Sequence, residues 1–328
     1  MKLSVESLSQ TPLINNGGEL VAPEPQLVEG SRTKIQTASP SVARGWVSIY
    51  ADLFKARLTL LVLLTTWVGF YLGCRGAVDY LLMLHTLLGT ALVASGASAL
   101  NQLLEREYDA KMRRTQDRPL PSGRMQPATV LVIGCVCAAL GLIYLAAAVN
   151  LLTCAVSAIS LFSYVFIYTP LKRITWLNTI VGAVPGALPP MIGWTAARNG
   201  LGGEAWALFG IQALWQLPHF LAIAWMYRTE YARAGFKMLP VIDEKGLRTS
   251  RQAVGFTLVL LPLSLCPFLF GMAGRLYLAS AVVLGLGFIW FAIQFARQLT
   301  IPRARQLFYL SILYLPLLLM AMVVDKVR

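Results

Sequence analysis

Charged side chains are scarce in this 328-residue chain. Asp, Glu, Lys and Arg make up only 13% of it, and 57% of its residues are hydrophobic. Soluble globular proteins average about 25% charged residues, so the composition excludes that class and indicates an integral membrane protein. Nine apolar runs approach the ~20 residues that a bilayer-spanning helix needs. They cover residues 58–73, 81–100, 129–148, 151–168, 177–196, 205–226, 253–271, 276–296 and 307–324.

Cysteine is also scarce, and its distribution excludes a disulfide framework. The five cysteines lie within or beside the apolar runs, without the spacing of a metal site. Cys135 and Cys137 would lie about 200° apart on a helix, which disfavours a shared metal ion. We expect the cysteines to pack as small apolar side chains. They are Cys74, Cys135, Cys137, Cys154 and Cys266.

Acidic residues are outnumbered by basic ones, 15 to 28, which gives a net charge of +13. Such an excess can indicate nucleic-acid binding. Here, however, 23 of the 28 basic residues precede the first apolar run or follow an even-numbered one. This is the positive-inside pattern with a cytoplasmic N-terminus. The basicity therefore indicates topology, and no nucleic-acid partner is expected.

The first 45 residues contain no apolar segment of the length found in signal peptides. They are polar, contain four prolines and carry charges of both signs, so they predict a disordered tail. Four glutamates in this tail argue against a mitochondrial transit peptide. We therefore expect a bacterial inner (plasma) membrane protein, with a nine-helix domain over residues 50–328.

Residues 101–124 are rich in charge, unlike the chain as a whole. Ten of these 24 residues are charged. If the preceding helix continues, Asn101, Glu105 and Asp109 recur every four residues and share one face. Two carboxylates and an amide oxygen suit Mg²⁺ bound together with a substrate's phosphates. The spacing therefore predicts a magnesium site at the membrane surface.

Several basic residues accompany this acidic stripe. Lys111, Arg113, Arg114 and Arg118 follow it directly, and their side chains are suited to diphosphate oxygens. Two prolines at 119 and 121 prevent the helix from continuing there. The alternative is a mixed-charge loop stabilised by pairs four residues apart, such as Glu107 with Lys111.

Two further polar clusters follow apolar runs on the same predicted side of the membrane. Lys172 and Arg173 follow the fourth run and could bind the same anion or only mark topology. Arg228 and Glu230 follow the sixth run, where Glu230 could supply a second metal ligand. Lys55, before the first run, is expected to be a membrane-surface anchor.

Two features lie inside the apolar runs. Pro185, Pro189 and Pro190 break the fifth run, which suggests that it lines a cavity. His219 in the sixth run is a functional candidate because ionisable groups are costly within a bilayer; a hydrogen-bonded structural histidine is the alternative. His85 in the second run is expected to be structural.

Taken together, these motifs resemble the intramembrane aromatic prenyltransferase superfamily of the UbiA type, over roughly residues 50–325. The resemblance rests on the stripe from Asn101 to Asp109, on Tyr-Thr-Pro-Leu-Lys-Arg at 168–173 and on Trp-Gln-x-Pro-His-Phe at 215–220. Arg-Thr-x-x-Arg-Pro-Leu-Pro at 114–121 and Pro-His-Phe are similar to the haem farnesyltransferases of that superfamily.

The resemblance implies a bundle of nine transmembrane helices around a central cavity, under a cytoplasmic cap, with Mg²⁺ held by two acidic motifs. The first motif corresponds to Asn101, Glu105 and Asp109. The second offers Glu230, but Ala234 stands where the superfamily often has a second aspartate. The full ligand set of a second metal ion therefore remains open.

The implied reaction transfers a farnesyl group from farnesyl diphosphate to a vinyl group of haem B (protohaem IX), with addition of water, giving haem O and diphosphate. The resemblance assigns the diphosphate to six basic residues. It assigns haem to His219 as an axial contact, with Trp215 and Tyr168 nearby. The catalytic set would be Asn101, Glu105, Asp109, Arg114, Arg118 and Lys172. The diphosphate ligands would be Arg113, Arg114, Arg118, Lys172, Arg173 and Arg228.

Two alternatives stay open. A related prenyltransferase would use a quinone precursor or another tetrapyrrole as acceptor. A secondary transporter would show an inverted repeat and polar residues at the membrane midplane, whereas the polar residues here gather at one end of the runs. Beyond its substrates and the lipid bilayer, a downstream haem-modifying enzyme or a terminal oxidase assembly is a candidate partner.

Overall fold

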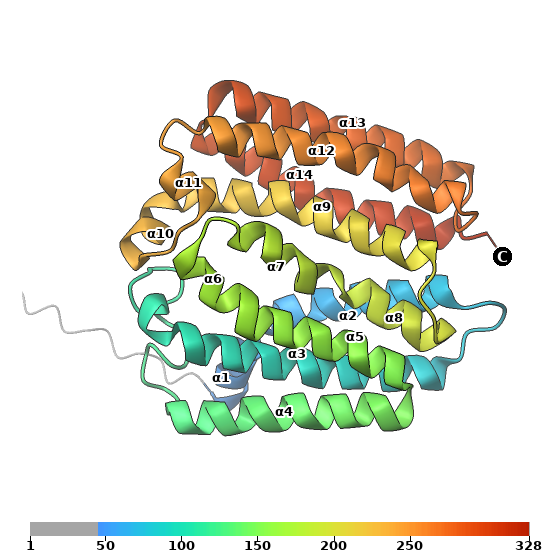
Figure 1. Cartoon of the computed structure of the whole chain (residues 1–328), viewed down its shortest axis with the longest axis horizontal. Coiled ribbons are helices and arrows are strands. Elements are labelled where there is room, and N and C mark those ends of the chain that lie inside the picture. The colour runs from blue at the N-terminus through green and yellow to red at the C-terminus, as the bar shows by residue number, and fades with distance from the viewer. Residues whose placement is uncertain (1–44, 328) are drawn as a thin grey trace, which may run out of the picture. The chain divides into compact units, whose positions relative to one another are not determined.

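The computed structural model describes residues 45–327, and these residues form helices joined by loops, without a β-strand (Figure 1). Within this part of the chain, nine helical segments are long and apolar enough to cross a membrane. The prediction of an all-α polytopic membrane protein is therefore confirmed. The tail predicted over residues 1–45 lies, except for its last residue, outside the described residues. The division into tail and helical domain stays a prediction.

Seven of the nine spans are single helices, and two are composite. The fourth span consists of α5 (Leu151–Phe162), the π-helix η1 (Ser163–Tyr168) and α6 (Thr169–Ile174); the fifth consists of α7 (Asn178–Ala187) and α8 (Pro189–Arg198). Three short helices, α1 (Trp46–Leu53), α10 (Arg228–Ala234) and α11 (Leu239–Ile242), lie outside the spans. The single-helix spans are α2 (Ala56–Gly73), α3 (Tyr80–Asp109), α4 (Pro127–Ala148), α9 (Gly203–Met226), α12 (Leu247–Leu269), α13 (Arg275–Gln298) and α14 (Ile301–Val324).

The break predicted in the fifth span lies at Leu188, between α7 and α8. Pro189 and Pro190 begin α8, where the missing N–H groups of proline cost no helical hydrogen bond. This span is also the most buried of the nine, with 72% of its apolar window inside the protein. A broken helix is tolerated there because other helices, not lipid, surround its backbone.

Glycine allows α2 and α8 to approach each other closely. A Cβ atom at Gly69 would lie 2.0 Å from the carbonyl oxygen of Pro190, and one at Gly193 would lie 1.9 Å from that of Thr66. Neither carbonyl can move without disturbing its helix. Glycine also allows α3 and α4 to approach each other closely, because Gly96 lies against the backbone of α4. Close packing of small residues replaces the hydrophobic effect as the force that associates helices in a bilayer.

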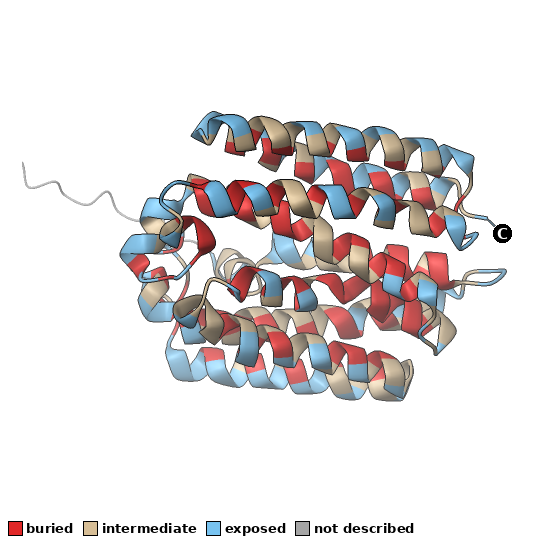
Figure 2. Cartoon of the chain, turned by 45° about the horizontal axis from the view of Figure 1, so that its top comes forward, coloured by how far each residue is buried: buried red, intermediate tan, exposed pale blue. Residues whose placement is uncertain are grey.

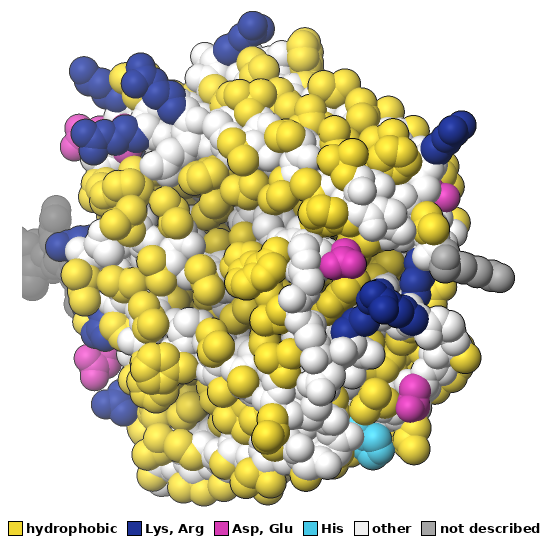
Figure 3. Space-filling view, turned by 45° about the vertical axis from the view of Figure 1, so that its right-hand side comes forward, with side chains coloured by type: hydrophobic (Ala, Val, Ile, Leu, Met, Phe, Trp, Pro, Cys, Tyr) yellow, Lys and Arg dark blue, Asp and Glu magenta, His cyan; other side chains and the backbone are white. Residues whose placement is uncertain are grey.

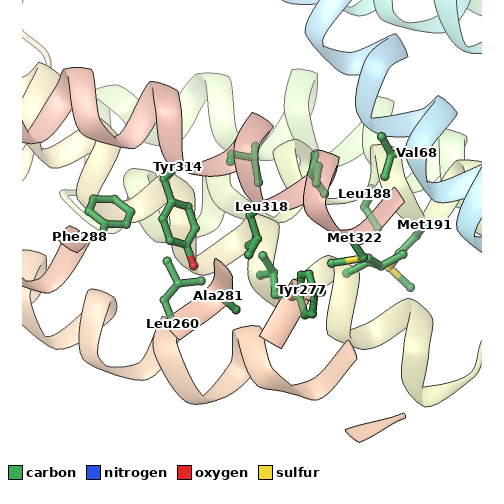
Figure 4. Close-up of a cluster of buried hydrophobic side chains, with 14 of the residues drawn as sticks. Val68, Leu188, Met191, Leu260, Tyr277, Ala281, Phe288, Tyr314, Leu318 and Met322 are labelled. Atoms are coloured by element: carbon green, nitrogen blue, oxygen red, sulfur yellow. The ribbon is translucent and has the colours of Figure 1, made fainter. Parts of the chain in front are cut away.

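The largest hydrophobic core lies among α2, α8, α9, α12, α13 and α14 (Figure 4). The rings of Phe288 and Tyr314 lie 5.0 Å apart, and both side chains are fully buried. The buried hydroxyl of Tyr314 is hydrogen-bonded to Ser264 Oγ at 2.8 Å, and that of Tyr277 donates to the Ser264 carbonyl at 2.7 Å. These bonds satisfy the polar groups that burial would otherwise leave unpaired.

Burial and charge follow the arrangement expected in a bilayer. Buried residues concentrate on the inward faces of the helices (Figure 2). Hydrophobic side chains cover most of the face shown in Figure 3, and charged side chains gather towards its two ends. We call the end that carries α6, α10 and α11 the capped end; it lies at the left of Figure 1. At the opposite end, Lys326 donates to the carbonyl groups of Tyr71 and Cys74. The cytoplasmic position of the N-terminus stays a prediction.

Candidate functional site

The acidic stripe lies on the last turns of α3, at the capped end. The helix continues through Asp109, as the spacing predicted. Asn101, Glu105 and Asp109 all face inward, and each is 5% exposed or less. Burial of two carboxylates so close together is costly unless cations or hydrogen bonds compensate them.

Three cations, one from each of three different segments, compensate the stripe. Lys172 on α6 places Nζ 2.7 Å from Oε1 of Glu105, and Arg118, in the loop after α3, places Nη1 2.6 Å from Oδ2 of Asp109. Lys55, just before α2, donates to Oδ1 of Asn101 at 2.6 Å. The predicted residues Glu105, Asp109, Arg118 and Lys172 therefore form one cluster.

Lys55 is the member of this cluster that sequence reasoning missed. The expectation of a membrane-surface anchor is wrong, because its ammonium group turns inward and also lies 3.3 Å from the Tyr164 hydroxyl. Its backbone is left-handed, with φ of 49° and ψ of 53°, a conformation that is strained for lysine and is often found at functional sites. Burial lowers the pKa of Lys55 to about 7, and the charge of Arg118 lowers this pKa as well. A bound anion would favour its charged form.

The π-helix η1 places two tyrosines, Tyr164 and Tyr168, beside this cluster. Such segments are rare and occur frequently at functional sites. The Tyr168 ring lies under Lys172, with 4.5 Å between Nζ and the ring centroid. Thr169, directly after η1, accepts a hydrogen bond from Asn101 Nδ2 at 3.0 Å. This bond and the Lys55 contact fix the orientation of the Asn101 amide.

Gly182 on α7 makes room for the Tyr168 ring. A Cβ atom there would lie 2.4 Å from Cε2 of Tyr168. We expect Gly182→Ala to displace the ring and to lower the free energy of unfolding by about 1–3 kcal/mol, the usual range for overpacking. Unfolding of the purified protein in detergent measures this loss. Gly255→Ala is the matched control, since a Cβ atom at Gly255 would meet no other atom within 4 Å; an equal loss there would contradict the packing explanation.

The other predicted diphosphate ligands lie against aromatic rings of the cap. Arg114 donates to the Tyr231 hydroxyl at 3.0 Å, and Arg173 donates to that of Tyr108 at 3.0 Å. Arg228 lies over the Trp225 ring, 4.4 Å from its centroid. Arg113 is exposed, and no interaction of its side chain with another described residue is present. The cap therefore holds cations that no carboxylate of residues 45–327 neutralises.

The carboxylate groups of Glu105, Asp109 and Glu230 are the candidate ligands for a magnesium ion. Among residues 45–327, no three His, Cys, Asp or Glu side chains lie close enough together to hold a metal ion, so Glu230 does not join Glu105 and Asp109 in one carboxylate group. Oε2 of Glu230 is buried without a hydrogen-bond partner. Oε1 of Glu105 contacts Lys172 but is not aligned in a hydrogen bond. The all-oxygen donor set fits Mg²⁺, although Lys172 and Arg118 now occupy one oxygen each of Glu105 and Asp109. The ligand assignment stays a prediction.

His219 on α9 lies between two rings, Trp215 on one side and Phe308 on the other, with centroid distances of 5.1 and 5.0 Å. Its Nδ1 lies 2.7 Å from Ser311 Oγ. The Ser311 hydroxyl also lies 2.6 Å from the Phe308 carbonyl. When the hydroxyl donates to this carbonyl, its oxygen accepts the Nδ1 proton of His219. Nε2 then keeps a free lone pair, as in an axial metal ligand.

His85 differs from His219 in its surroundings. Its Nδ1 is bonded to the Tyr144 hydroxyl at 2.7 Å, and the two residues join α3 to α4. This contact agrees with the structural role expected for His85.

Nine helical spans with buried carboxylates and cations gathered at one end are the features of a polytopic membrane enzyme. The chain belongs to the UbiA prenyltransferase family, which matches it over residues 62–315. Two curated relatives carry the name protoheme IX farnesyltransferase. The protein from Solibacter usitatus is 48% identical and the one from Salinibacter ruber is 46% identical. Each alignment covers 84% of this chain and 98% of the relative.

Solved structures show the same fold at low sequence identity. A digeranylgeranylglyceryl phosphate synthase superimposes with a TM-score of 0.73 at 16% identity, over 85% of this chain and 98% of its own. A UbiA homolog from Archaeoglobus fulgidus bound to DMAPP and Mg²⁺ gives a TM-score of 0.59 at 18% identity, over 83% of this chain and 98% of its own. These similarities confirm the UbiA-type fold.

Proposed function

We propose that this enzyme transfers a farnesyl group from farnesyl diphosphate to a vinyl group of haem B, with addition of water, and so makes haem O and diphosphate. The observation that carries the proposal is the 48% identity, over 98% of its length, to a protoheme IX farnesyltransferase. The geometry of His219 supports it, because a half-buried imidazole whose Nδ1 donates to Ser311 would leave Nε2 free for the iron of a haem acceptor.

The capped end would bind the diphosphate. Asn101, Glu105 and Asp109 would hold Mg²⁺, as the UbiA homolog solved with DMAPP and Mg²⁺ supports, and Glu230, which lies apart from this carboxylate pair, would serve a second metal ion. The metal would neutralise negative charge on the leaving diphosphate. Lys172 and Arg118 lie within 3 Å of the carboxylates, where they can bind diphosphate oxygens beside the metal.

Bond breaking would generate charge in two places, and the chain has groups for both. The C–O bond electrons pass to the diphosphate, where Arg114 and Lys172 stabilise them. The allylic cation that remains would face aromatic rings, among which Tyr168 already contacts a cation. The cation adds to the haem vinyl group, and water captures the resulting carbocation with loss of a proton. Apolar helices around the farnesyl chain would exclude water until then.

The enzyme would act in a bacterial plasma membrane, with the capped end on the cytoplasmic side. The basic residues of loops at that end support this orientation. Haem O would then pass to a haem-modifying enzyme or to a terminal oxidase assembly.

A product assay tests the proposal. We expect membranes containing this protein, given haem B, farnesyl diphosphate and Mg²⁺, to form a pigment heavier than haem B by a farnesyl group and a hydroxyl group. Chelation of divalent metal should abolish the product, because the diphosphate would leave without charge compensation. Chromatography with mass detection measures it. Unchanged haem beside a correctly inserted protein would contradict the haem assignment, and quinone precursors would then be tested as acceptors.

A further inference from the structure

A pocket lies between the end of α9 and the beginning of α14, and we call it the α9/α14 pocket. It encloses about 280 Å³ and is lined by Met226, Tyr227, Ile301, Arg305, Phe308 and Tyr309. Ile301, Arg305 and Tyr309 are exposed, so the pocket is open to the outside of the bundle at the capped end. Nothing in the reaction described so far uses it.

The inner wall of the pocket is shared with the His219 site. Phe308 lines the pocket and also stacks on His219, with 5.0 Å between ring centroids. The carbonyl of Phe308 also accepts a hydrogen bond from Ser311, whose Oγ lies 2.7 Å from His219 Nδ1. Phe308 therefore belongs both to the pocket wall and to the surroundings of His219.

The pocket also adjoins one of the residues predicted to bind the farnesyl diphosphate. Tyr227 lines it, and the Arg114 guanidinium lies over the Tyr227 ring, 5.4 Å from its centroid. Arg114 is one of the predicted diphosphate ligands. Phe308 of the pocket thus contacts His219, the candidate ligand of the haem acceptor, and Tyr227 contacts Arg114, a candidate ligand of the farnesyl diphosphate.

Arg305 gives the pocket a charge without a partner. Its guanidinium has no hydrogen bond or ion pair with any residue that the structure describes. Arg303, which precedes it on the same helix, contrasts with it. Two glutamine side chains, Gln298 and Gln306, hold the Arg303 guanidinium at 2.7 and 2.9 Å. Arg305 is therefore free to bind an anion from outside the chain.

We propose that the α9/α14 pocket admits the tetrapyrrole acceptor from the side of the bundle and that Arg305 binds its carboxylate-bearing edge. This inference rests on the proposed function, since haem B carries two propionates on one edge. An arginine fork matches a carboxylate in geometry and charge. With the propionates at Arg305, the ring would extend past Phe308 towards His219, and the vinyl groups on the far edge would lie deeper in the bundle.

The test compares haem B with its dimethyl ester, in which the propionate charges are removed. The full chain in lipid nanodiscs is assayed with saturating farnesyl diphosphate and varied acceptor. We expect the wild type to show a KM about fivefold higher for the ester, the upper range for an exposed ion pair. Arg305→Met should raise KM for haem B to the ester's value and leave KM for farnesyl diphosphate unchanged. Arg303→Met, the matched control, should keep the wild-type ratio, and Arg305→Lys should retain part of it.

The outcomes separate this inference from the function on which it rests. A wild type that farnesylates neither acceptor would overturn the proposed function itself. If the wild type is active and Arg305→Met discriminates between haem B and its ester as strongly as wild type does, the pocket is not the acceptor's binding site. An equal loss of discrimination in Arg303→Met would likewise overturn the assignment, because it would indicate a diffuse effect of surface charge.

Discussion

Asp109→Asn is expected to reduce turnover by about 10²–10³-fold, the loss seen when one preorganised charge-stabilising group is removed from an active site. Asp109 is 2% exposed and lies at the end of the α3 stripe. Asparagine keeps the shape of the side chain but removes the negative charge that a divalent cation needs. The rate with haem B and farnesyl diphosphate, measured over a wide range of Mg²⁺ concentration, gives the result. We expect the Mg²⁺ concentration for half-maximal rate to rise together with the loss of rate.

The control for Asp109→Asn is Asp117→Asn. Asp117 lies in the loop after α3 and is exposed, so this substitution removes the same charge without touching the stripe. We expect it to retain nearly wild-type turnover. Unfolding of both variants in detergent should show intact folds. Wild-type turnover by Asp109→Asn at every Mg²⁺ concentration would exclude the stripe from metal binding.

The nine spans could be predicted from sequence because the bilayer sets their length and composition directly. The inward face of the stripe could be predicted for a similar reason. Asn101, Glu105 and Asp109 belong to one continuous helix, and helical geometry alone places them together. Both predictions depend only on neighbours along the chain.

The pairing of the stripe with its cations could not be predicted in this way. Lys55 is 46 residues from Asn101, and only the packing of α2 against α3 decides whether its side chain faces lipid or the interior. A basic residue beside an apolar run has the same local pattern in either case. The surroundings that decide the tautomer of His219 could not be predicted from the sequence for the same reason, because they include Ser311, 92 residues away.

Lys172→Met is expected to lower the free energy of unfolding by about 3–5 kcal/mol when no divalent metal is present, the cost of leaving a buried charge unpaired. The Glu105 side chain is only 7% exposed, and Lys172 is the cation in contact with it. Methionine keeps much of the aliphatic stem and removes the ammonium group. Equilibrium unfolding in detergent with a chelator measures the loss. Arg173→Met is the matched control, since Arg173 rests on Tyr108 instead of a carboxylate, and it should cost far less.

A double variant separates the charge pair from other effects of Lys172. Glu105→Gln in the Lys172→Met background removes the orphaned charge, so it should recover most of the lost stability. Together with Glu105→Gln alone, the two variants complete a double-mutant cycle that gives the coupling energy of the pair. Neither variant should recover turnover, because both lack a predicted diphosphate ligand. Mg²⁺ should stabilise Lys172→Met, where Glu105 is free to bind it, and should stabilise the double variant much less. Equal stabilisation of both variants by Mg²⁺ would place the metal away from Glu105. If the double variant unfolds as easily as Lys172→Met, the lost free energy of unfolding would come from lost packing around Lys172 and not from the orphaned charge.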